Sequence, residues 1–383
     1  MVMRGNFKTP LDFIPAGCAE IFFLHGRAIG VLMLAVTLME PRIGLSGLVA
    51  IFSAYGFAAL IGMRQGFTEN GFYTYNALLI GFSLGNLFDI SPLGLLFAAT
   101  AGALSLMVCL SMNQVFSQYL RLPVFSLPFV IVSSMFYLAL EGRPELDSAG
   151  LGLWFDPALP LWIEGFLTSL GALLFLPDVG SGAVLALLLL WHSRIQFLLA
   201  VGGFLIGAGF AGLLGTPLEQ AWLEPGNFNF ILIAITLGGV FLVPSGSSFA
   251  VAALAVCIAV PLSDAAEVLL SPYDLPFFTL PFNAVTLLFL YGLGLIRFPQ
   301  MATVIEPTPE ATLDHHLGVR HHSPADEPVV RLPFSGSWTL WQGFNGPWTH
   351  QGTQRYACDF LLEVVGSTHR DDGTRLEHYY AWG

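Results

Sequence analysis

The first 300 residues carry long uncharged apolar runs. Three of them, Leu93 to Leu110, Phe197 to Leu214 and Phe228 to Val243, approach the roughly 20 residues that a helix needs to span a bilayer. Hydrophobic residues make up 55% of the chain and charged residues 10%, against about 25% charged residues in a typical soluble domain. The pattern predicts an all-α polytopic membrane protein.

The pattern changes near Arg297. Residues 298–330 are rich in Pro, Asp, Glu and His with little apolar periodicity, which indicates a solvated linker. Residues 331–383 recover short alternating apolar stretches between Gly and Asn turns, which favours short strands. We therefore expect a membrane domain over residues 1–297, a linker, and a short β-rich C-terminal fragment.

The charge balance bears on partners. The net charge of −12 argues against a basic nucleic-acid-binding face, so we expect a lipid bilayer and no nucleic acid as partner. The four cysteines have no paired spacing, and the polar start of the chain shows no cleavable signal peptide. No cofactor is expected from these features.

An internal repeat is the strongest pattern in the chain. The segment LPVFSLPFV at residues 122–130 matches LPFFTLPFN at residues 275–283 in six of nine positions, at an offset of 153. We call these two segments the proline boxes. Ser126 lies opposite Thr279, so each box also holds one hydroxyl at the same position.

Two further blocks keep nearly the same offset. Residues 73–85 fall on residues 226–238, which places Asn76 on Asn229, and residues 17–30 match residues 169–182 more weakly at an offset of 152. We therefore expect two homologous halves, about 10–150 and 160–297, each with roughly five spans. An odd number of spans requires the second half to be inverted relative to the first, and inverted repeats are typical of transporters.

The prolines predict non-helical backbone at membrane depth. Such backbone is tolerated only where it lines a polar cavity or is buried in protein, so two symmetric boxes are expected to frame one pore with broken or re-entrant helices. Simple helix kinks are the alternative. No spanning segment presents a row of Lys, Arg or His, which disfavours an ion or proton pathway.

At this point the chain resembles the urea transporter family. The boxes are similar to that family's duplicated LPxxTxPF motif, and GFYTYNALLIGFSLG and GNFNFILIAITLGG are similar to its YNAxLxG segment and the second-half partner. The resemblance covers about residues 10–297. It implies passive, channel-like transport of urea by a homotrimer with one pore per protomer, in the bacterial inner membrane, without enzymatic activity.

The resemblance and the chemistry of urea together nominate a pore lining. Urea is planar and neutral, so it needs flat apolar walls, in-plane acceptors for its N–H groups and a donor for its carbonyl; broken-helix carbonyls supply acceptors in other channels. Helix capping by the asparagines, hydroxyls bonded back to a helix carbonyl, and an interfacial glutamate are the alternatives. The expected lining residues are Glu20, Phe23, Asn76, Phe125, Ser126, Asn229, Phe278 and Thr279.

Two departures from the family pattern stand out. The second-half equivalent of Glu20 is Ala172, and the family's Asn-Pro-x-x-Gly turn appears without its proline at His25 to Gly30 and at Asp178 to Gly182. The pore is therefore expected to be less symmetric than in the family. A channel for another small amide or for ammonia remains the alternative function.

The C-terminal fragment resembles the start of a lysostaphin-type zinc peptidase. By position in the motif, His350 and Asp359 match two zinc ligands of that family. Zinc hydrolysis needs a third protein ligand and an open position for water, and no His-x-His pair follows Asp359. The expectation is an incomplete, inactive fragment; a membrane-anchored cell-wall zinc metallopeptidase is the alternative from another class.

Overall fold

The computed structural model describes residues 13–63, 75–140, 157–322, 338–342, 358–362 and 379–382. The chain divides into two compact units, Met1–His322 and Ser323–Gly383. Within the described residues, the helices belong to the first unit and the strands to the second. Each unit is considered by itself.

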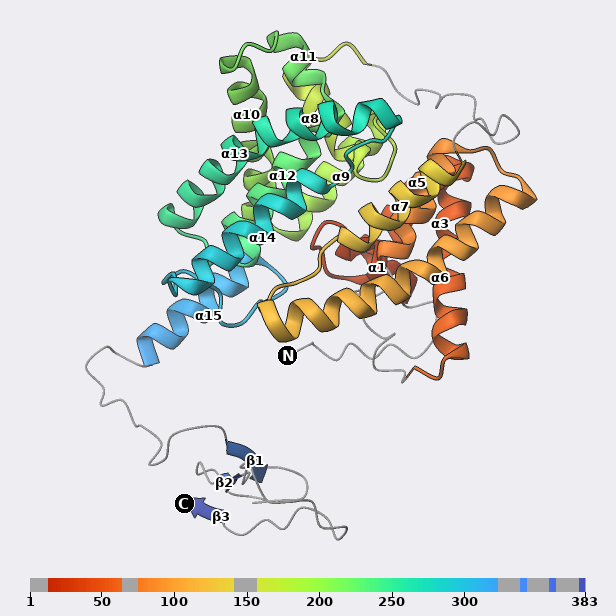
Figure 1. Cartoon of the computed structure of the whole chain (residues 1–383). Helices are drawn as coiled ribbons and strands as arrows, with labels where there is room; N and C mark the ends of the chain where they lie inside the picture. The colour runs from red at the N-terminus through yellow and green to blue at the C-terminus, as the bar shows by residue number, and fades with distance from the viewer. Residues whose placement is uncertain are drawn as a thin grey trace. The chain divides into compact units, whose positions relative to one another are not determined.

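Helices of two lengths build the first half of the larger unit (Figure 1). Helices shorter than about 17 residues rise too little to cross a bilayer alone. The long helices are α3 (Pro41–Leu60) and α6 (Pro92–Val115), the latter continuing into the π-helical turn η3 (Phe116–Leu120); the short ones are α1 (Phe13–Glu20), α2 (Arg27–Leu38), α5 (Tyr75–Leu87) and α7 (Leu127–Leu140).

The second half repeats this order 152 or 153 residues later. A shift of 153 carries the first and last residues of α3 onto those of α10. Two additional short elements, α11 (Leu218–Leu223) and η5 (Pro225–Asn227), correspond to positions outside the described residues. The repeating elements are α8 (Leu161–Ala172), α9 (Val179–His192), α10 (Arg194–Leu213), α12 (Phe228–Ile235) with η6 (Thr236–Val240), α13 (Gly246–Leu270) with η7 (Ser271–Tyr273), and α14 (Leu280–Leu295).

The described helices confirm the expectation of an all-α membrane domain; the number of spans per half is not part of this result. In the described part of the chain, four helical segments are long and apolar enough to cross a membrane: Pro41–Leu60, Pro92–Leu120, Arg194–Leu213 and Gly246–Tyr273. They form two pairs at the offset of 153. Large apolar side chains on these helices lie at the surface, where a bilayer would solvate them.

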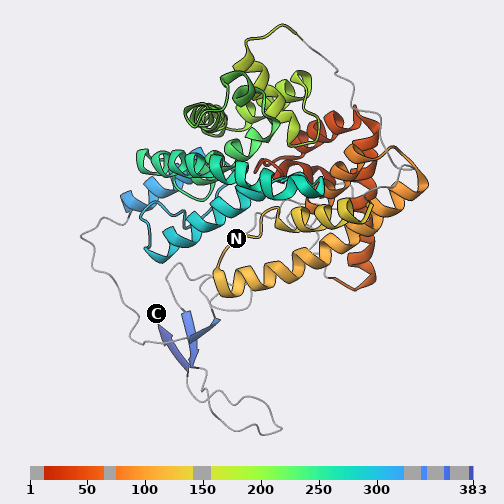
Figure 2. The same ribbon diagram turned by 45° about the horizontal axis from the view of Figure 1, so that its top comes forward.

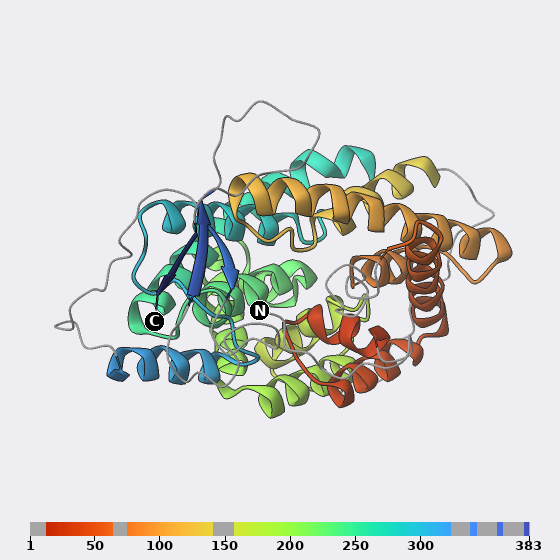
Figure 3. The same ribbon diagram turned by 90° about the horizontal axis from the view of Figure 1, so that it is seen from below.

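Each half packs in the same way. The helix α3 contacts α5 and α6, and α10 contacts α12 and α13. Between the halves, α2 contacts its counterpart α9, and α7 contacts its counterpart α14. In two further views, the red-to-yellow helices of the first half and the green-to-cyan helices of the second gather largely on different sides of the unit (Figures 2 and 3).

Each proline box begins a new helix. Its first proline, Pro123 or Pro276, lies in non-helical backbone, and its second, Pro128 or Pro281, lies in the first turn of α7 or α14. Proline is well tolerated there because the first helical N–H groups have no intrahelical acceptor. The boxes therefore separate two helices rather than kinking one.

The segment assigned to a linker differs from that expectation up to His322. It contains the helix α15 (Pro309–His322), which contacts α10 and η6 and belongs to the larger unit. Hydrogen bonds to its Glu310 side chain attach it to the start of α10. Because this attachment is polar, the sequence shows no apolar periodicity there. The remainder, residues 323–330, lies outside the described residues.

The smaller unit contains a three-stranded antiparallel sheet in the order β1-β2-β3. The strands are β1 (Trp338–Gln342), β2 (Cys358–Leu362) and β3 (Tyr379–Trp382). Residue Phe360 in the central strand pairs with Leu340 on one side and with Tyr380 on the other. This sheet is the described part of the predicted β-rich fragment.

Candidate solute pathway

A cavity of about 730 Å³ lies inside the larger unit and is lined by residues of both halves. It brings together six of the eight residues that the sequence nominated; both hydroxyl residues are 6% exposed, and Phe125 and Phe278 are buried as well. The non-helical backbone of the boxes contributes Pro123, Leu275 and Pro276 to the wall. The nominated residues in the lining are Glu20, Phe23, Phe125, Ser126, Phe278 and Thr279.

Four phenylalanines in the cavity wall have left-handed backbone. The φ angles are 57° at Phe23, 50° at Phe125, 61° at Phe175 and 47° at Phe278. This conformation costs a residue with a β-carbon about 1–2 kcal/mol, so packing must impose it. Phe175 lies 152 residues after Phe23, and Phe278 lies 153 after Phe125, so both halves use the same device.

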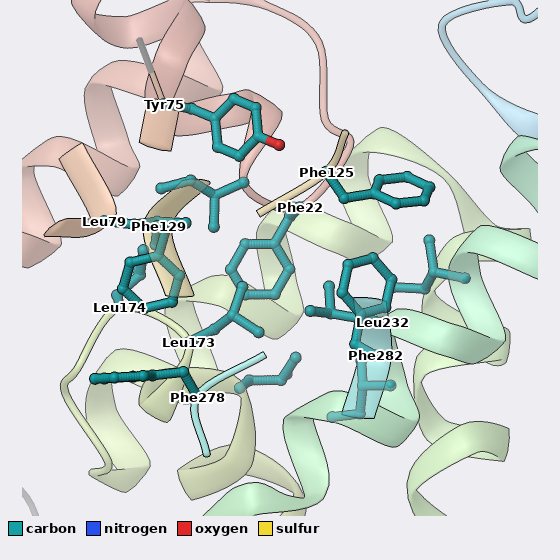
Figure 4. Packing of buried hydrophobic residues seen from close by; sticks show 14 of the residues in the cluster. Phe22, Tyr75, Leu79, Phe125, Phe129, Leu173, Leu174, Leu232, Phe278 and Phe282 are labelled. Carbon is teal, nitrogen blue, oxygen red and sulfur yellow. The ribbon is translucent and has the colours of Figure 1, made fainter. Parts of the chain in front are cut away.

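These side chains form two aromatic clusters at equivalent places. The first contains Phe23, Phe125 and Phe282; the ring centroids of Phe125 and Phe282 are 5.2 Å apart. The second contains their counterparts, and the centroids of Phe129 and Phe278 are 5.0 Å apart (Figure 4). Each cluster combines rings of both halves. The first cluster joins two first-half rings to Phe282 of the second half, and the second cluster joins two second-half rings to Phe129, the first-half counterpart of Phe282. The second cluster comprises Phe129, Phe175 and Phe278.

A hydroxyl pair joins the two boxes. The Oγ of Ser126 lies 2.7 Å from Oγ1 of Thr279, which is hydrogen-bonding distance. The Asn283 side chain donates from Nδ2 to both hydroxyl oxygens, at 3.0 Å and 3.1 Å. Apart from the aromatic walls, the cavity therefore carries a small polar centre.

The two nominated asparagines lie behind the boxes and outside the cavity wall. Asn76 donates from Nδ2 to the carbonyl of Phe125 at 3.2 Å and accepts at Oδ1 from the N–H of Phe129 at 3.1 Å. Asn229 repeats both bonds with Phe278 and Phe282, at 3.0 Å and 3.1 Å. Both side chains are fully buried. Each amide holds one box in place, and neither caps its own helix.

Glu20 ends α1 at the cavity, and its symmetric position is apolar. Its Oε1 lies 4.0 Å from Nε2 of His25, whose ring stacks against His192 at 6.1 Å. Ala172, the second-half equivalent, also lines the cavity. The departure from symmetry that the sequence predicted thus falls on the cavity wall.

Comparison with known proteins identifies relatives of this chain. The family model for urea transporters matches residues 11–294. The chain belongs to the urea transporter family. Two similar relatives are "Urea transporter 1" of Ovis aries, 26% identical over 299 residues, and "Urea transporter 1" of Rattus norvegicus, 25% identical over 295 residues. In both cases the match covers 73% of this chain and 76% of the relative.

A segment beyond the urea transporter match also lines the cavity. We call residues 298–310 the strap. The N–H of Val243 donates to the carbonyl of Gln300 at 2.8 Å, and Nε2 of His192 lies 3.0 Å from the carbonyl oxygen of Pro307. The strap contributes to the cavity wall Ile305, Glu306, Pro307 and Pro309.

The carboxylate of Glu310 fixes the end of the strap. It accepts from Oγ of Ser193 at 2.7 Å and from the N–H of Ile195 at 2.9 Å. Burial raises the pKa of Glu310, but these hydrogen bonds lower it by more, so the folded pKa lies below 4.5. The carboxylate therefore stabilises the attachment above about pH 4.5, and this contribution is lost as the pH falls through the folded pKa.

We expect Glu310→Ala to release α15 from α10. Losing hydrogen bonds to a charged group costs about 1.5–3 kcal/mol each, so the hydrogen-exchange protection of α15 at neutral pH should fall at least about tenfold. Hydrogen exchange with mass spectrometry measures this. Asp314→Ala removes an exposed carboxylate from the same helix and serves as the control. Equal protection in Glu310→Ala and in the wild type would contradict the assigned anchor.

The peptidase-like features have little structural description. His350 lies outside the described residues, and Asp359 is placed in β2 through its backbone only. Among the described residues, no group of three His, Cys, Asp or Glu side chains is arranged to hold a metal ion. The family match ends before this fragment begins.

The structure adds three wall residues, and Asn283 behind the wall, that the sequence interpretation missed. Phe175 was detectable, because the offset of 152 carries Phe23 onto it. Phe129 and Phe282 belong to the boxes but were not among the nominated residues. Asn283 has no polar counterpart, since the equivalent first-half residue is Val130. The repeat therefore gave no reason to select it.

Proposed function

We propose that this urea transporter conducts urea passively through the central cavity. The observation that carries the proposal is the pair of equivalent aromatic clusters around a hydroxyl pair, in a chain of this family. Flat rings suit the faces of planar urea, and hydroxyls suit its edges. A neutral solute moving down its gradient needs neither a counter-charge nor an energy source.

Non-helical backbone of the boxes supplies the remaining polar contacts in this proposal. The segments around Pro123 and Pro276 line the cavity without helical hydrogen bonds, so their carbonyls are available to accept urea N–H groups. The two asparagines keep these segments in position. Exchange of water for a fixed row of acceptors is how channel filters dehydrate a solute at low cost.

The halves are proposed to be inverted repeats related by a pseudo-two-fold axis. Contact of α2 with α9 and of α7 with α14 supports this, because an axis brings elements close to it against their own copies. The proposed domain limits keep a membrane domain that begins with residues 1–297 and also includes residues 298–322, and a separate C-terminal fragment at residues 331–383. The assembly is proposed to be a homotrimer with one pore per protomer, located in a bacterial inner membrane.

The experiment is stopped-flow light scattering on proteoliposomes facing gradients of urea, acetamide or ammonia. Urea-selective conduction predicts a urea flux well above the flux of protein-free vesicles and above the acetamide flux. Equal fluxes for all three solutes would support the general small-amide or ammonia channel instead. Peptidoglycan hydrolysis and bound zinc in the purified protein would favour the metallopeptidase alternative.

The hydroxyl pair gives a first site-directed test. Replacing Ser126 by Ala and Thr279 by Val together removes both hydroxyls, so we expect the urea flux to fall about tenfold, the effect of losing hydrogen bonds worth about 1.5 kcal/mol. Each single variant should lose less, because the remaining hydroxyl still serves the solute. Thr236→Val is the control, since among the described residues that buried hydroxyl bonds only to the carbonyl of Leu232, one turn earlier in α12. An unchanged flux in the double variant would remove the pair from the site.

A further inference from the structure

Asn283 is the one polar side chain that contacts the hydroxyl pair from behind in the described structure. It is fully buried, and its Nδ2 lies 2.7 Å from the carbonyl oxygen of Thr279 and 3.0 Å and 3.1 Å from the two hydroxyl oxygens, so its two N–H groups are shared among three acceptors. A carbonyl oxygen can only accept. The amide nitrogen must therefore face the boxes, and the orientation of the Asn283 amide is fixed by chemistry.

This orientation determines where the hydroxyl protons go. One hydroxyl proton fills the 2.7 Å bond between Ser126 and Thr279, in whichever direction it runs. The other cannot be donated to the Asn283 nitrogen that faces both oxygens, because an amide nitrogen donates hydrogen bonds and does not accept them. Among the described residues, neither hydroxyl has a backbone carbonyl as acceptor. One O–H therefore remains, and both of its possible carriers line the cavity.

We propose that Asn283 is a positioning residue that makes the hydroxyl pair present one O–H donor to the carbonyl oxygen of the solute. The inference rests on the proposed urea pathway and deepens it, because it assigns the centre a preference for a good hydrogen-bond acceptor. The symmetric residue Val130 cannot do the same, so one half alone sets this polarity.

The preference separates urea from thiourea. Thiourea has the same planar N–H edges, but its sulfur is bulkier and accepts hydrogen bonds poorly. An O–H donor at the centre therefore helps urea more than thiourea. Without Asn283, the hydroxyl protons are free to turn toward nearby backbone carbonyls, as Ser and Thr in helices commonly do.

The test compares urea and thiourea flux in proteoliposomes containing wild-type protein or Asn283→Val. Loss of one uncharged hydrogen bond predicts a urea flux about threefold to tenfold lower, with a smaller loss for thiourea, so that the urea-to-thiourea ratio falls. A narrowed or distorted pore would exclude the larger thiourea more strongly, and the ratio would rise. Asn283→Ala, which is smaller and packs without clash, is the second variant and should shift the ratio in the same direction.

Thr286→Val is the matched control. Thr286 lies one turn further along α14, is equally buried, and its Oγ1 has no hydrogen-bond partner in the described structure. Its removal should leave both fluxes unchanged. A ratio that stays constant or rises in both Asn283 variants, in protein that still conducts urea, would overturn the inference alone. Absence of urea flux in the wild type would overturn the proposed function and the inference with it.

Discussion

Replacing Asn229 by Leu is expected to slow urea flux at least about 30-fold. The side chain holds the second box through two buried bonds, one to the carbonyl of Phe278 and one from the N–H of Phe282. Leucine has a similar size but satisfies neither group. Each orphaned backbone group costs about 1–3 kcal/mol, and a combined 2 kcal/mol corresponds to roughly a 30-fold loss of the correct box position.

Stopped-flow flux and the melting temperature in detergent should be measured together. Asn76→Leu breaks the same two bonds in the first half and should give a comparable loss. Asn227→Leu is the control, because Asn227 is also buried but donates to the carbonyl of Ala221, away from the box. Folded Asn229→Leu protein that conducts at the wild-type rate would show that the box does not depend on this amide.

The sequence was sufficient to predict features of the site that depend on nearby residues or on the internal repeat. Prolines in the boxes dictate where regular helix stops, and repetition at one offset placed Asn76 opposite Asn229 before any contact was known. The functional assignment of these asparagines was less complete. Their role in holding the boxes depends on residues about 50 positions away, and no local pattern encodes that distance.

Contacts between the halves could not be predicted from the sequence either, because they join residues that are far apart in the chain. The pairing of Phe125 with Phe282 joins residues that are neighbours only after both halves fold. Asn283 breaks the repeat, so an argument from symmetry passes over it. The strap resembled a linker because its attachment uses polar groups such as Glu310, and hydrogen bonds of this kind leave no apolar periodicity.

Two glycines allow close helix crossings on either side of the aromatic residues of the cavity wall. Gly30 packs α2 onto α1, and Gly182 packs α9 onto α8, at positions 152 residues apart. A β-carbon on either glycine would lie 1.8 Å from a backbone carbonyl oxygen, of Pro15 or Leu167. These crossings bracket the left-handed turns at Phe23 and Phe175, so the close approach determines where both rings stand.

Gly182→Ala is therefore expected to abolish the folded transporter. Backbone atoms cannot rotate away from the added methyl group, so the helices must separate, and the cost should exceed the 1–3 kcal/mol typical of overpacking. Gly202→Ala is the matched control in α10, since a β-carbon there meets nothing within 4 Å and helix propensity favours alanine by up to about 1 kcal/mol. Size-exclusion profiles and melting temperatures in detergent measure both. Monodisperse Gly182→Ala protein with an unchanged melting temperature would contradict the close helix crossing. Loss of folded Gly182→Ala protein, beside stable Gly202→Ala protein, would show that the fold around the pore depends on the close approach of these two backbones.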